Sequence, residues 1–372
     1  MNLIQNQNKA EEALLLASTD VIAFGKLFLP DDYLRSETPP FHYEVADAID
    51  DRDVRQSAII LPRGHGKTIL TKASILKDFT FCPNDDMLFY AWVSATQKLA
   101  VGNMDYIKYH LENNEKILYY FGQQKGRKWT EEDIELQNGC KLISKSNVTG
   151  IRGGAKLHKR YDLIILDDFE HEENTLTKES RDKNANLVTA VVYPALEPET
   201  GRIRVNGTPV HYDSFINNLL INNEKAKSDG KDFAWKVITH KALDDNGNFL
   251  WASFFTPKIM EQKKKFYYDS GQPSKFYQEY FMQVQSEEDA IWRQEDITTY
   301  KGYVDYDADE KINYLHLENQ DRIPINCFIG CDPATDIDTK TSDFSVIMVI
   351  GIDTNRNTYV LEYERHRSIP TL

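Results

Sequence analysis

The sequence predicts an α/β fold built on a mostly parallel sheet. An apolar run at 57–61 breaks into a turn with two glycines and reopens as a helix from about Ile69 to Phe81. A second run, Leu163–Leu166, has four consecutive apolar residues and ends in an aspartate pair. Apolar runs without polar alternation are typical of strands buried on both faces of a parallel sheet, whose carboxyl ends carry the chemistry.

The composition is that of a globular protein. The chain has 372 residues, of which 41% are hydrophobic and 27% are charged, so it is long enough for two domains with buried cores. No apolar stretch reaches the length of a membrane span, and the N-terminus lacks the basic and apolar regions of a signal peptide. We therefore expect a cytoplasmic protein. The four cysteines are scattered, which favours buried thiols over a zinc site.

The charge is acidic but unevenly spread. A net charge of −14 argues against a protein that coats nucleic acid over its whole surface. Residues 136–161 nevertheless contain six basic residues and no acidic one. Such a strip either touches DNA in one place or is an ordinary solvated face.

Two helices are predicted before the first strand. Apolar positions three and four residues apart predict a helix over 9–28. Two consecutive prolines then lead into an amphipathic run over 40–49, which predicts a turn followed by a helix. Phe41 and His42 lie at its start.

The turn after the first strand has the layout of a phosphate-binding loop. Gly64 and Gly66 free backbone N–H groups that can curl around a polyphosphate. Lys67 supplies a positive charge for the β and γ oxygens, and Thr68 places a hydroxyl where a nucleotide-bound Mg²⁺ needs one. The helix that follows directs the positive end of its dipole at the same anion.

This loop departs from the usual pattern G-x-x-x-x-G-K-[ST] at its start. Leu61 occupies the first glycine position, and Arg63 lies inside the loop. The alternative is a chance Gly-Lys-Thr in a surface turn, although strand, turn and helix follow in the required order. Phe41 and His42 could stack on or hydrogen-bond an adenine, or they could hold the start of their helix as a hydrophobic staple.

The carboxylates after Leu166 fit two roles at such a site. Asp167 would hold Mg²⁺ through its water shell, and the next carboxylate would orient the attacking water. Asp168 is the first choice for this second role and Glu170 the reserve. Adjacent strand residues point to opposite sides, so Asp168 must turn out of the strand, while Glu170 lies beyond its end. The alternative is a pair of aspartates that cap a helix over 175–193.

Further predicted strands and helices alternate along the chain. The segment 114–140, in contrast, is predicted to be a loop-rich part of the surface. The strands are 87–93, 202–206 and 235–242, and the helices are 94–113, 257–268 and 273–282. Thr208, after the second of these strands, would sense the γ-phosphate and transmit its loss, or would merely cap the next helix.

The end of the chain predicts a second sheet. We expect an ATPase domain over 1–285, an acidic linker over 286–324 with weak periodicity, and a new domain over 325–372. In that domain a strand ends in Asp332, and a polar loop that contains Asp343 leads into a β-hairpin.

The order of these motifs resembles that of the large terminase subunit of tailed bacteriophages, the ATP-driven motor that packages DNA into the procapsid and cuts it. The resemblance covers essentially the whole chain. The motifs that carry it are 39–42, 61–68, 94–97, 150–153 with 163–168, 207–209, and 330–334 with 342–345. Each is weak alone, but their joint order is specific, and the missing first glycine is a trait of the family.

The resemblance implies a P-loop NTPase of the ASCE type, with a mostly parallel sheet, followed by a ribonuclease H-like nuclease domain. The ATP-binding residues would be Phe41, His42, Arg63, Gly64, His65, Gly66, Lys67 and Thr68. Thr208 would belong to the coupling motif. Arg63 would offset developing charge within its own subunit, and Arg152 in its own or a neighbouring site. Thr68 and Asp167 would hold the Mg²⁺ of the ATPase, and Asp332 and Asp343 would hold Mg²⁺ or Mn²⁺ in the nuclease.

Two features depart from the family. Many members have Asp-Glu where this chain has Asp167 and Asp168, so the water-orienting residue stays open between Asp168 and Glu170. The later acidic residues of the nuclease would lie beyond Leu372. We therefore expect an incomplete nuclease domain, from a truncated or a split protein, and an ATPase that does not cut DNA.

The implied partners are double-stranded DNA, the portal protein and the small terminase subunit. The protein would form a homo-oligomeric ring on the procapsid in the host cytoplasm, with its few basic residues lining one channel. A DNA helicase or repair-type P-loop ATPase is the alternative, but it would need a second recombinase-like domain. A nucleotide-binding scaffold would have no use for Asp167 and Asp168.

Overall fold

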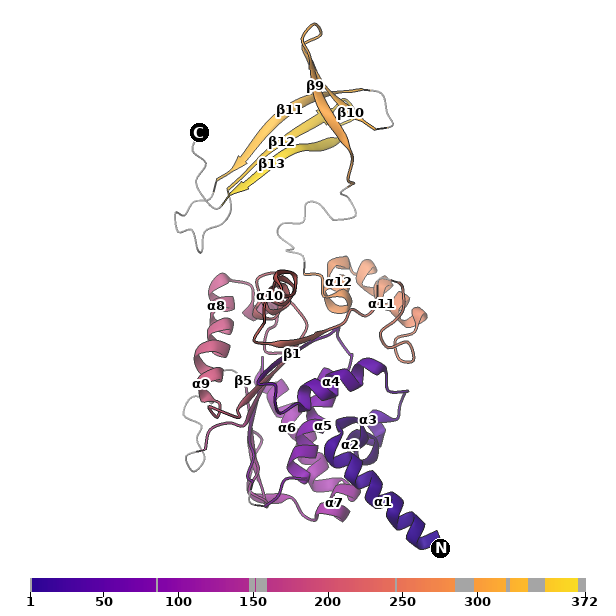
Figure 1. Cartoon of the computed structure of the whole chain (residues 1–372), viewed down its shortest axis with the longest axis vertical. Helices are drawn as coiled ribbons and strands as arrows, with labels where there is room; N and C mark the ends of the chain where they lie inside the picture. The colour runs from indigo at the N-terminus through magenta and orange to yellow at the C-terminus, as the bar shows by residue number, and fades with distance from the viewer. Residues whose placement is uncertain are drawn as a thin grey trace. The chain divides into compact units, whose positions relative to one another are not determined.

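The computed structural model describes residues 2–84, 86–146, 151, 159–244, 246–284, 298–318, 322–333 and 345–366. The chain divides into two compact units, Met1–Ala290 and Ile291–Leu372, and each contains its own sheet (Figure 1).

The first unit is built on an eight-stranded sheet in the order β3-β4-β5-β2-β6-β7-β1-β8. The strands from β5 to β8 in this order pair in parallel, whereas β3 and β4 add an antiparallel edge. The strands are β1 (Gln56–Ile60), β2 (Phe89–Ser94), β3 (Lys125–Trp129), β4 (Asp133–Leu136), β5 (Lys141–Ser146), β6 (Leu163–Asp167), β7 (Arg202–Gly207) and β8 (Lys236–Thr239). The prediction of a mixed α/β fold with a mostly parallel sheet is confirmed.

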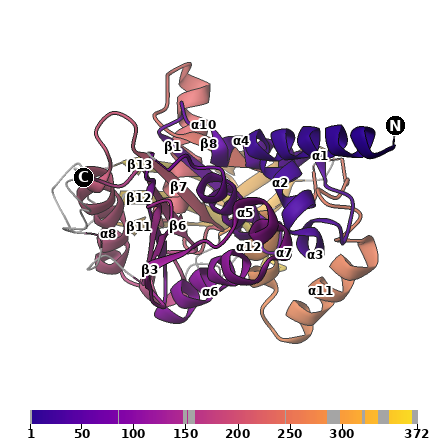
Figure 2. The same ribbon diagram turned by 90° about the horizontal axis from the view of Figure 1, so that it is seen from below.

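Helices cover both faces of this sheet (Figures 1 and 2). One face carries α1 (Asn2–Thr19), α2 (Val21–Phe28), α3 (Pro30–Tyr33), α4 (Pro40–Asp50), α5 (Lys67–Thr80), α6 (Gln97–Asn113) and α7 (Glu115–Phe121). The other carries α8 (Lys178–Asn186), the π-helical turn η3 (Leu187–Val192), α9 (Tyr193–Ala195) and α10 (Phe215–Asp229). Successive residues of a strand contribute to the two hydrophobic cores that lie on opposite faces of the sheet. Ile59 joins the first core and Ile60 the second, as the twofold repeat of a strand requires.

A smaller helical layer adjoins the carboxyl ends of the strands. It contains α11 (Pro257–Asp269) and α12 (Pro273–Phe281), which pack together around Phe255, Met260 and Phe276. A short 3₁₀ turn, η2 (Glu172–Asn174), follows β6. Among the described residues, no helix combines the length and apolarity needed to cross a bilayer.

The predicted helix over 9–28 is in fact two helices. Asp20 separates α1 from α2, because its side chain accepts a hydrogen bond from the Ala23 N–H at 2.7 Å and starts a new helix there. The segment 114–140 is also more ordered than expected. It contains α7, β3 and β4, and Asn114 caps α7 by accepting two backbone N–H groups.

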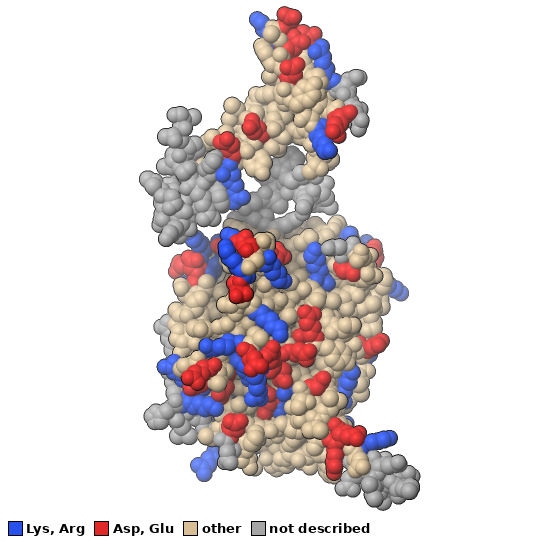
Figure 3. All heavy atoms as spheres, viewed as in Figure 1, with Lys and Arg blue, Asp and Glu red and all other residues tan. Residues whose placement is uncertain are grey.

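The basic strip at 136–161 includes the inner strand β5, which sequence patterning did not predict. Its lysines have carboxylate partners: Lys141 pairs with Asp133, Lys145 with Glu132, and Lys159 with Asp162. Basic and acidic side chains also lie interspersed on the face of the first unit in Figure 3. Three of the six basic residues of this strip are therefore neutralised locally. Arg152 and Lys156 lie outside the described residues.

The second unit is an antiparallel sheet in the order β13-β12-β11-β10-β9. Its strands are β9 (Gly302–Asp307), β10 (Ile312–Leu317), β11 (Ile323–Asp332), β12 (Ser345–Asp353) and β13 (Thr358–His366). The expected linker over 286–324 must be corrected, because it contains β9 and β10. Nearly every residue of β9 is exposed, so its sequence shows no alternation between an apolar and a polar face.

Candidate active site

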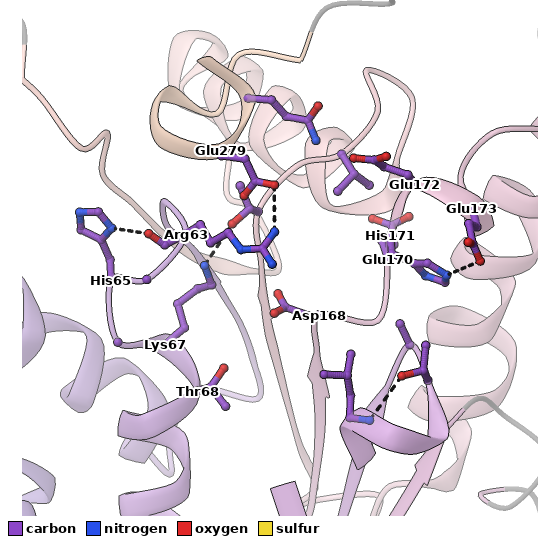
Figure 4. Close-up of a pocket in the computed structure, with 18 of the residues that line it drawn as sticks. Arg63, His65, Lys67, Thr68, Asp168, Glu170, His171, Glu172, Glu173 and Glu279 are labelled. Carbon is purple, nitrogen blue, oxygen red and sulfur yellow. Dashed lines mark hydrogen bonds and ion pairs between the residues drawn. The ribbon is translucent and has the colours of Figure 1, made fainter. Parts of the chain in front are cut away.

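A cavity of about 730 Å³ opens at the carboxyl ends of the central strands. The loop after β1 forms one wall, and the segment after β6 forms the opposite wall (Figure 4). The carboxyl edge of a parallel sheet is where ligands bind in α/β folds. Predicted site residues that line the cavity are Arg63, Gly64, His65, Gly66, Lys67, Thr68, Asp168, Glu170 and Thr208.

The loop between β1 and α5 takes a conformation that depends on its glycines. Gly64 and Gly66 have φ values of +77° and +87°, in the left-handed region that glycine adopts readily. A Cβ atom on Gly66 would also lie 2.7 Å from Nε2 of His42. Helix α5 begins directly afterwards at Lys67, so its N-terminal N–H groups face the cavity.

The Lys67 side chain hydrogen-bonds to the backbone of its own loop. Its ammonium donates to the carbonyl oxygen of Leu61 at 2.8 Å, to that of Pro62 at 3.3 Å and to Oγ1 of Thr208 at 3.1 Å. Burial lowers the pKa of the Lys67 ammonium. A charged donor that holds neutral acceptors gains by exchanging them for an anionic one. The Thr208 hydroxyl that accepts from Lys67 also donates to the carbonyl oxygen of Leu61 at 2.8 Å.

Thr68 and Asp167 meet at the start of α5. The Thr68 hydroxyl lies 3.1 and 3.2 Å from the two carboxylate oxygens of Asp167. Asp167 is buried, and that burial, together with the charge of Asp168, raises its pKa to about 6. A hydroxyl beside a carboxylate is an oxygen donor set of the kind that Mg²⁺ prefers.

Asp168 and Glu170 differ sharply in their surroundings. Asp168 leaves the strand with φ +46°, and its side chain points into the cavity toward Lys67 (Figure 4). Glu170 is 4% exposed, and its two oxygens accept the backbone N–H groups of Phe215 and Ile216, each at 2.9 Å. The Glu170 carboxylate therefore caps the start of α10, whereas that of Asp168 is free to act in the cavity.

Arg63 is held by a residue that sequence reasoning missed. Its guanidinium lies 3.0 Å from Oε1 of Glu279, and its backbone N–H donates to the Glu279 carbonyl at 2.9 Å. Glu279 raises the pKa of the Arg63 guanidinium. Glu279 is on α12, 216 residues after Arg63 in the chain. No local sequence pattern therefore indicates this ion pair. The contact between Arg63 and Glu279 holds the small helical layer against the loop between β1 and α5.

Phe41 and His42 support the loop from outside the cavity. Nε2 of His42 lies 3.1 Å from the carbonyl oxygen of His65, and a carbonyl only accepts, so Nε2 carries the proton. Burial lowers the pKa of both histidines to about 4, which keeps them neutral. The His65 ring stacks on Phe255 at 4.4 Å. Phe41 lines a separate cavity with Glu44 and His240, and its contact with an adenine stays a prediction.

The predicted nuclease ligands are not assembled in the described residues. Asp332 is exposed at the end of β11. Its neighbours in register are Val346 on β12 and then Arg365 on β13, and neither is a carboxylate. Asp343 lies outside the described residues, as does Arg152. No group of three or more His, Cys, Asp or Glu side chains that could hold a metal occurs in the described part of the chain.

Comparisons with known proteins place this fold. No family model and no curated protein sequence matches the chain. The crystal structure of the large terminase of bacteriophage HK97 matches it with a TM-score of 0.51 and 15% identity, over 94% of this chain and 67% of that one.

Two further solved structures score lower. The large terminase of a thermophilic bacteriophage in complex with ADP has a TM-score of 0.42 and 11% identity, over 90% and 71% of the two chains. The ATPase domain of the Thermus phage P74-26 large terminase has a TM-score of 0.45 and 12% identity, over 65% and 93%. With the HK97 match, the expected resemblance is confirmed in three dimensions: this chain has the fold of a bacteriophage large terminase.

Proposed function

We propose that this chain is the ATP-hydrolysing motor subunit of a viral terminase. One observation carries the proposal: Lys67, Thr68, Asp168 and Thr208 line one cavity at the N-terminus of α5 and the ends of β6 and β7, and Asp167 contacts Thr68 beside it. These are the groups that phosphoryl transfer from a nucleotide requires. The match to the HK97 terminase supports the same function at the level of the fold.

ATP and Mg²⁺ fit the residues present. Gly64 and Gly66 let the loop take its left-handed conformation along the cavity, and the start of α5 adds backbone donors for phosphate oxygens. Thr68 and Asp167 would hold Mg²⁺, directly or through its waters. Mg²⁺ held there would supply positive charge against the negative charge that develops on the transferred phosphate.

Hydrolysis of ATP would then depend on the positions of Asp168, Arg63 and Arg152. Asp168 orients the attacking water, because its side chain faces the cavity while that of Glu170 is committed to α10. Arg63 offsets charge on the γ-phosphate once it leaves Glu279, and Arg152 could act in its own site or in a neighbouring one. Thr208, which loses its contact with Lys67 but keeps that with the Leu61 carbonyl when Lys67 binds phosphate, reports the state of the nucleotide to β7 and α10.

The free energy of ATP hydrolysis would be used to move double-stranded DNA into a procapsid. The chain would act in a homo-oligomeric ring with the portal protein and the small terminase subunit, in the host cytoplasm. The second unit would be part of a ribonuclease H-like nuclease domain that uses Mg²⁺ or Mn²⁺ and cuts concatemeric DNA. Asp332, at the end of a central strand of that unit, supports this assignment.

Lys67→Ala tests the ATPase directly. We expect turnover to fall at least ~100-fold, because a preorganised cation at the transferred phosphate is lost. Circular dichroism and thermal unfolding should show that the variant keeps its fold. Lys258→Ala, which removes an exposed lysine of α11 instead, is the control and should retain activity. Unchanged ATP hydrolysis in Lys67→Ala would refute the assignment of the loop.

A further inference from the structure

Asn206 lies in the middle of the parallel sheet, next to Asp167. It is a residue of β7, and its neighbours in register are Ile59 of β1 and Asp167 of β6. Its side chain is fully buried, with 0% exposed. Burying an amide is unfavourable unless its polar atoms are hydrogen-bonded, so the partners of this side chain indicate what it does.

The amide nitrogen of Asn206 uses both of its protons. Nδ2 donates to Oδ1 of Asp167 at 3.0 Å and to Oγ1 of Thr71 at 2.9 Å. The Thr71 hydroxyl gives its own proton to the carbonyl oxygen of Lys67, at 3.0 Å, so toward Asn206 it can only accept. Turning the amide over would set its oxygen against the Asp167 carboxylate. The orientation with Nδ2 toward Asp167 is therefore the favourable one.

Asn206 fixes the rotation of the Asp167 carboxylate, which Thr68 alone does not. The single Thr68 proton is almost equidistant from the two Asp167 oxygens, with the hydroxyl oxygen at 3.1 and 3.2 Å. Among the residues that the structure describes, Asn206 is the one that donates to Oδ1 alone. Asn206 is in turn anchored by Thr71, one turn beyond Lys67 on α5, and so ties β6 and β7 to the helix of the phosphate loop.

The remaining polar atom of Asn206 is also informative. Its Oδ1 is buried and accepts no hydrogen bond from any residue that the structure describes. An unused buried acceptor beside an ion-binding carboxylate is a place for a water molecule or a ligand donor.

We propose that Asn206 is a positioning residue that orients Asp167 for Mg²⁺, and so sets how strongly Mg²⁺ enhances nucleotide binding. The proposal rests on the function proposed above. Residues that orient a metal-binding side chain are typically worth about 10–100-fold in metal affinity. Asn206 should act on the Mg²⁺-dependent part of nucleotide affinity and leave the Mg²⁺-free part alone.

The test uses the full chain and a fluorescent, non-hydrolysable ATP analogue, so that the readout does not depend on turnover. Its Kd is measured with excess Mg²⁺ and with EDTA, for the unmodified chain and for Asn206→Leu, which has the same branching and number of side-chain heavy atoms but cannot form hydrogen bonds. We expect the Kd in EDTA to change by less than ~3-fold, and the gain on adding Mg²⁺ to shrink by about 10-fold or more. An unchanged gain would overturn the proposal.

Two further variants guard against a purely structural effect. Asn223→Leu replaces another buried asparagine, on α10, and should keep the full gain. If Asn206→Leu does not fold, Thr71→Ala decides, because it frees Asn206 without touching Asp167. A reduced gain supports the role and an intact gain overturns it. An unmodified chain that binds no analogue under either condition would instead refute the proposed function, a result that is distinct from a variant that merely loses the Mg²⁺ effect.

Discussion

Replacing Glu170 by glutamine, and Asp168 by asparagine, should separate a structural carboxylate from a chemical one. Glu170 accepts two backbone N–H groups at the start of α10, and it is 4% exposed, so solvent screens it little. Glutamine keeps one acceptor and turns an NH₂ group toward the other N–H. The variant loses one hydrogen bond to a charged group and leaves a buried donor unsatisfied, which together amount to about 2–4 kcal/mol of unfolding free energy.

For a unit of this size such a loss lowers Tm by about 3–7 °C. Asp168→Asn should behave in the opposite way. Asparagine tolerates the φ of +46°, so Tm should barely move, whereas kcat should fall at least ~100-fold because the water loses its base. Differential scanning calorimetry and a steady-state ATPase assay on both variants give the comparison. A large loss of kcat in Glu170→Gln with Tm unchanged, and a mild effect of Asp168→Asn, would refute the reasoning.

Three other outcomes follow from the site and the second unit. Glu279→Ala should tighten nucleotide binding by up to ~5-fold, since it releases an exposed Arg63 from an ion pair worth at most about 1 kcal/mol; weaker binding by calorimetry would contradict this. His42 and His65 both have a folded pKa of about 4, so the unfolded state binds the extra protons as pH falls below 6.5, and each histidine should lower the unfolding free energy by about 2.5 kcal/mol between pH 7 and pH 4.5. His42→Gln keeps a donor for the carbonyl of His65 and should remove the His42 share of that dependence in urea titrations, whereas an unaltered slope would assign it to other groups. Plasmid incubated with the chain and Mg²⁺ or Mn²⁺ should stay uncut, and Asp332→Ala should leave ATP hydrolysis unchanged; cleavage that disappears in that variant would show a complete nuclease site.

The sequence alone was sufficient for the features that are local in the chain. A strand, a glycine turn and a helix start follow one another between 57 and 72, so spacing and residue type were enough to place Lys67 and Thr68 at the start of a helix after a glycine turn. Apolar runs without alternation predicted the parallel sheet. Because the carboxyl ends of parallel strands share one edge, Asp167 and Thr208 could be expected near that loop before any contact was known.

Weak local patterns explain what was missed in the fold. Strand β5 is flanked by lysines whose carboxylate partners lie elsewhere in the chain. Strands β9 and β10 form a sheet with little buried apolar surface. In both cases the pairing partner, and not the alternation of the strand itself, decides that a strand forms.

Tertiary structure alone decided which neighbours each site residue has. Asp168 and Glu170 are two residues apart, yet only the position of α10 shows that Glu170 is a cap. Arg63 meets Glu279 across 216 residues, and Asn206 reaches Asp167 across 39. Such pairs follow from how the sheet and the helical layers pack, and a pattern read along one stretch of chain carries no information about a partner that packing brings from another.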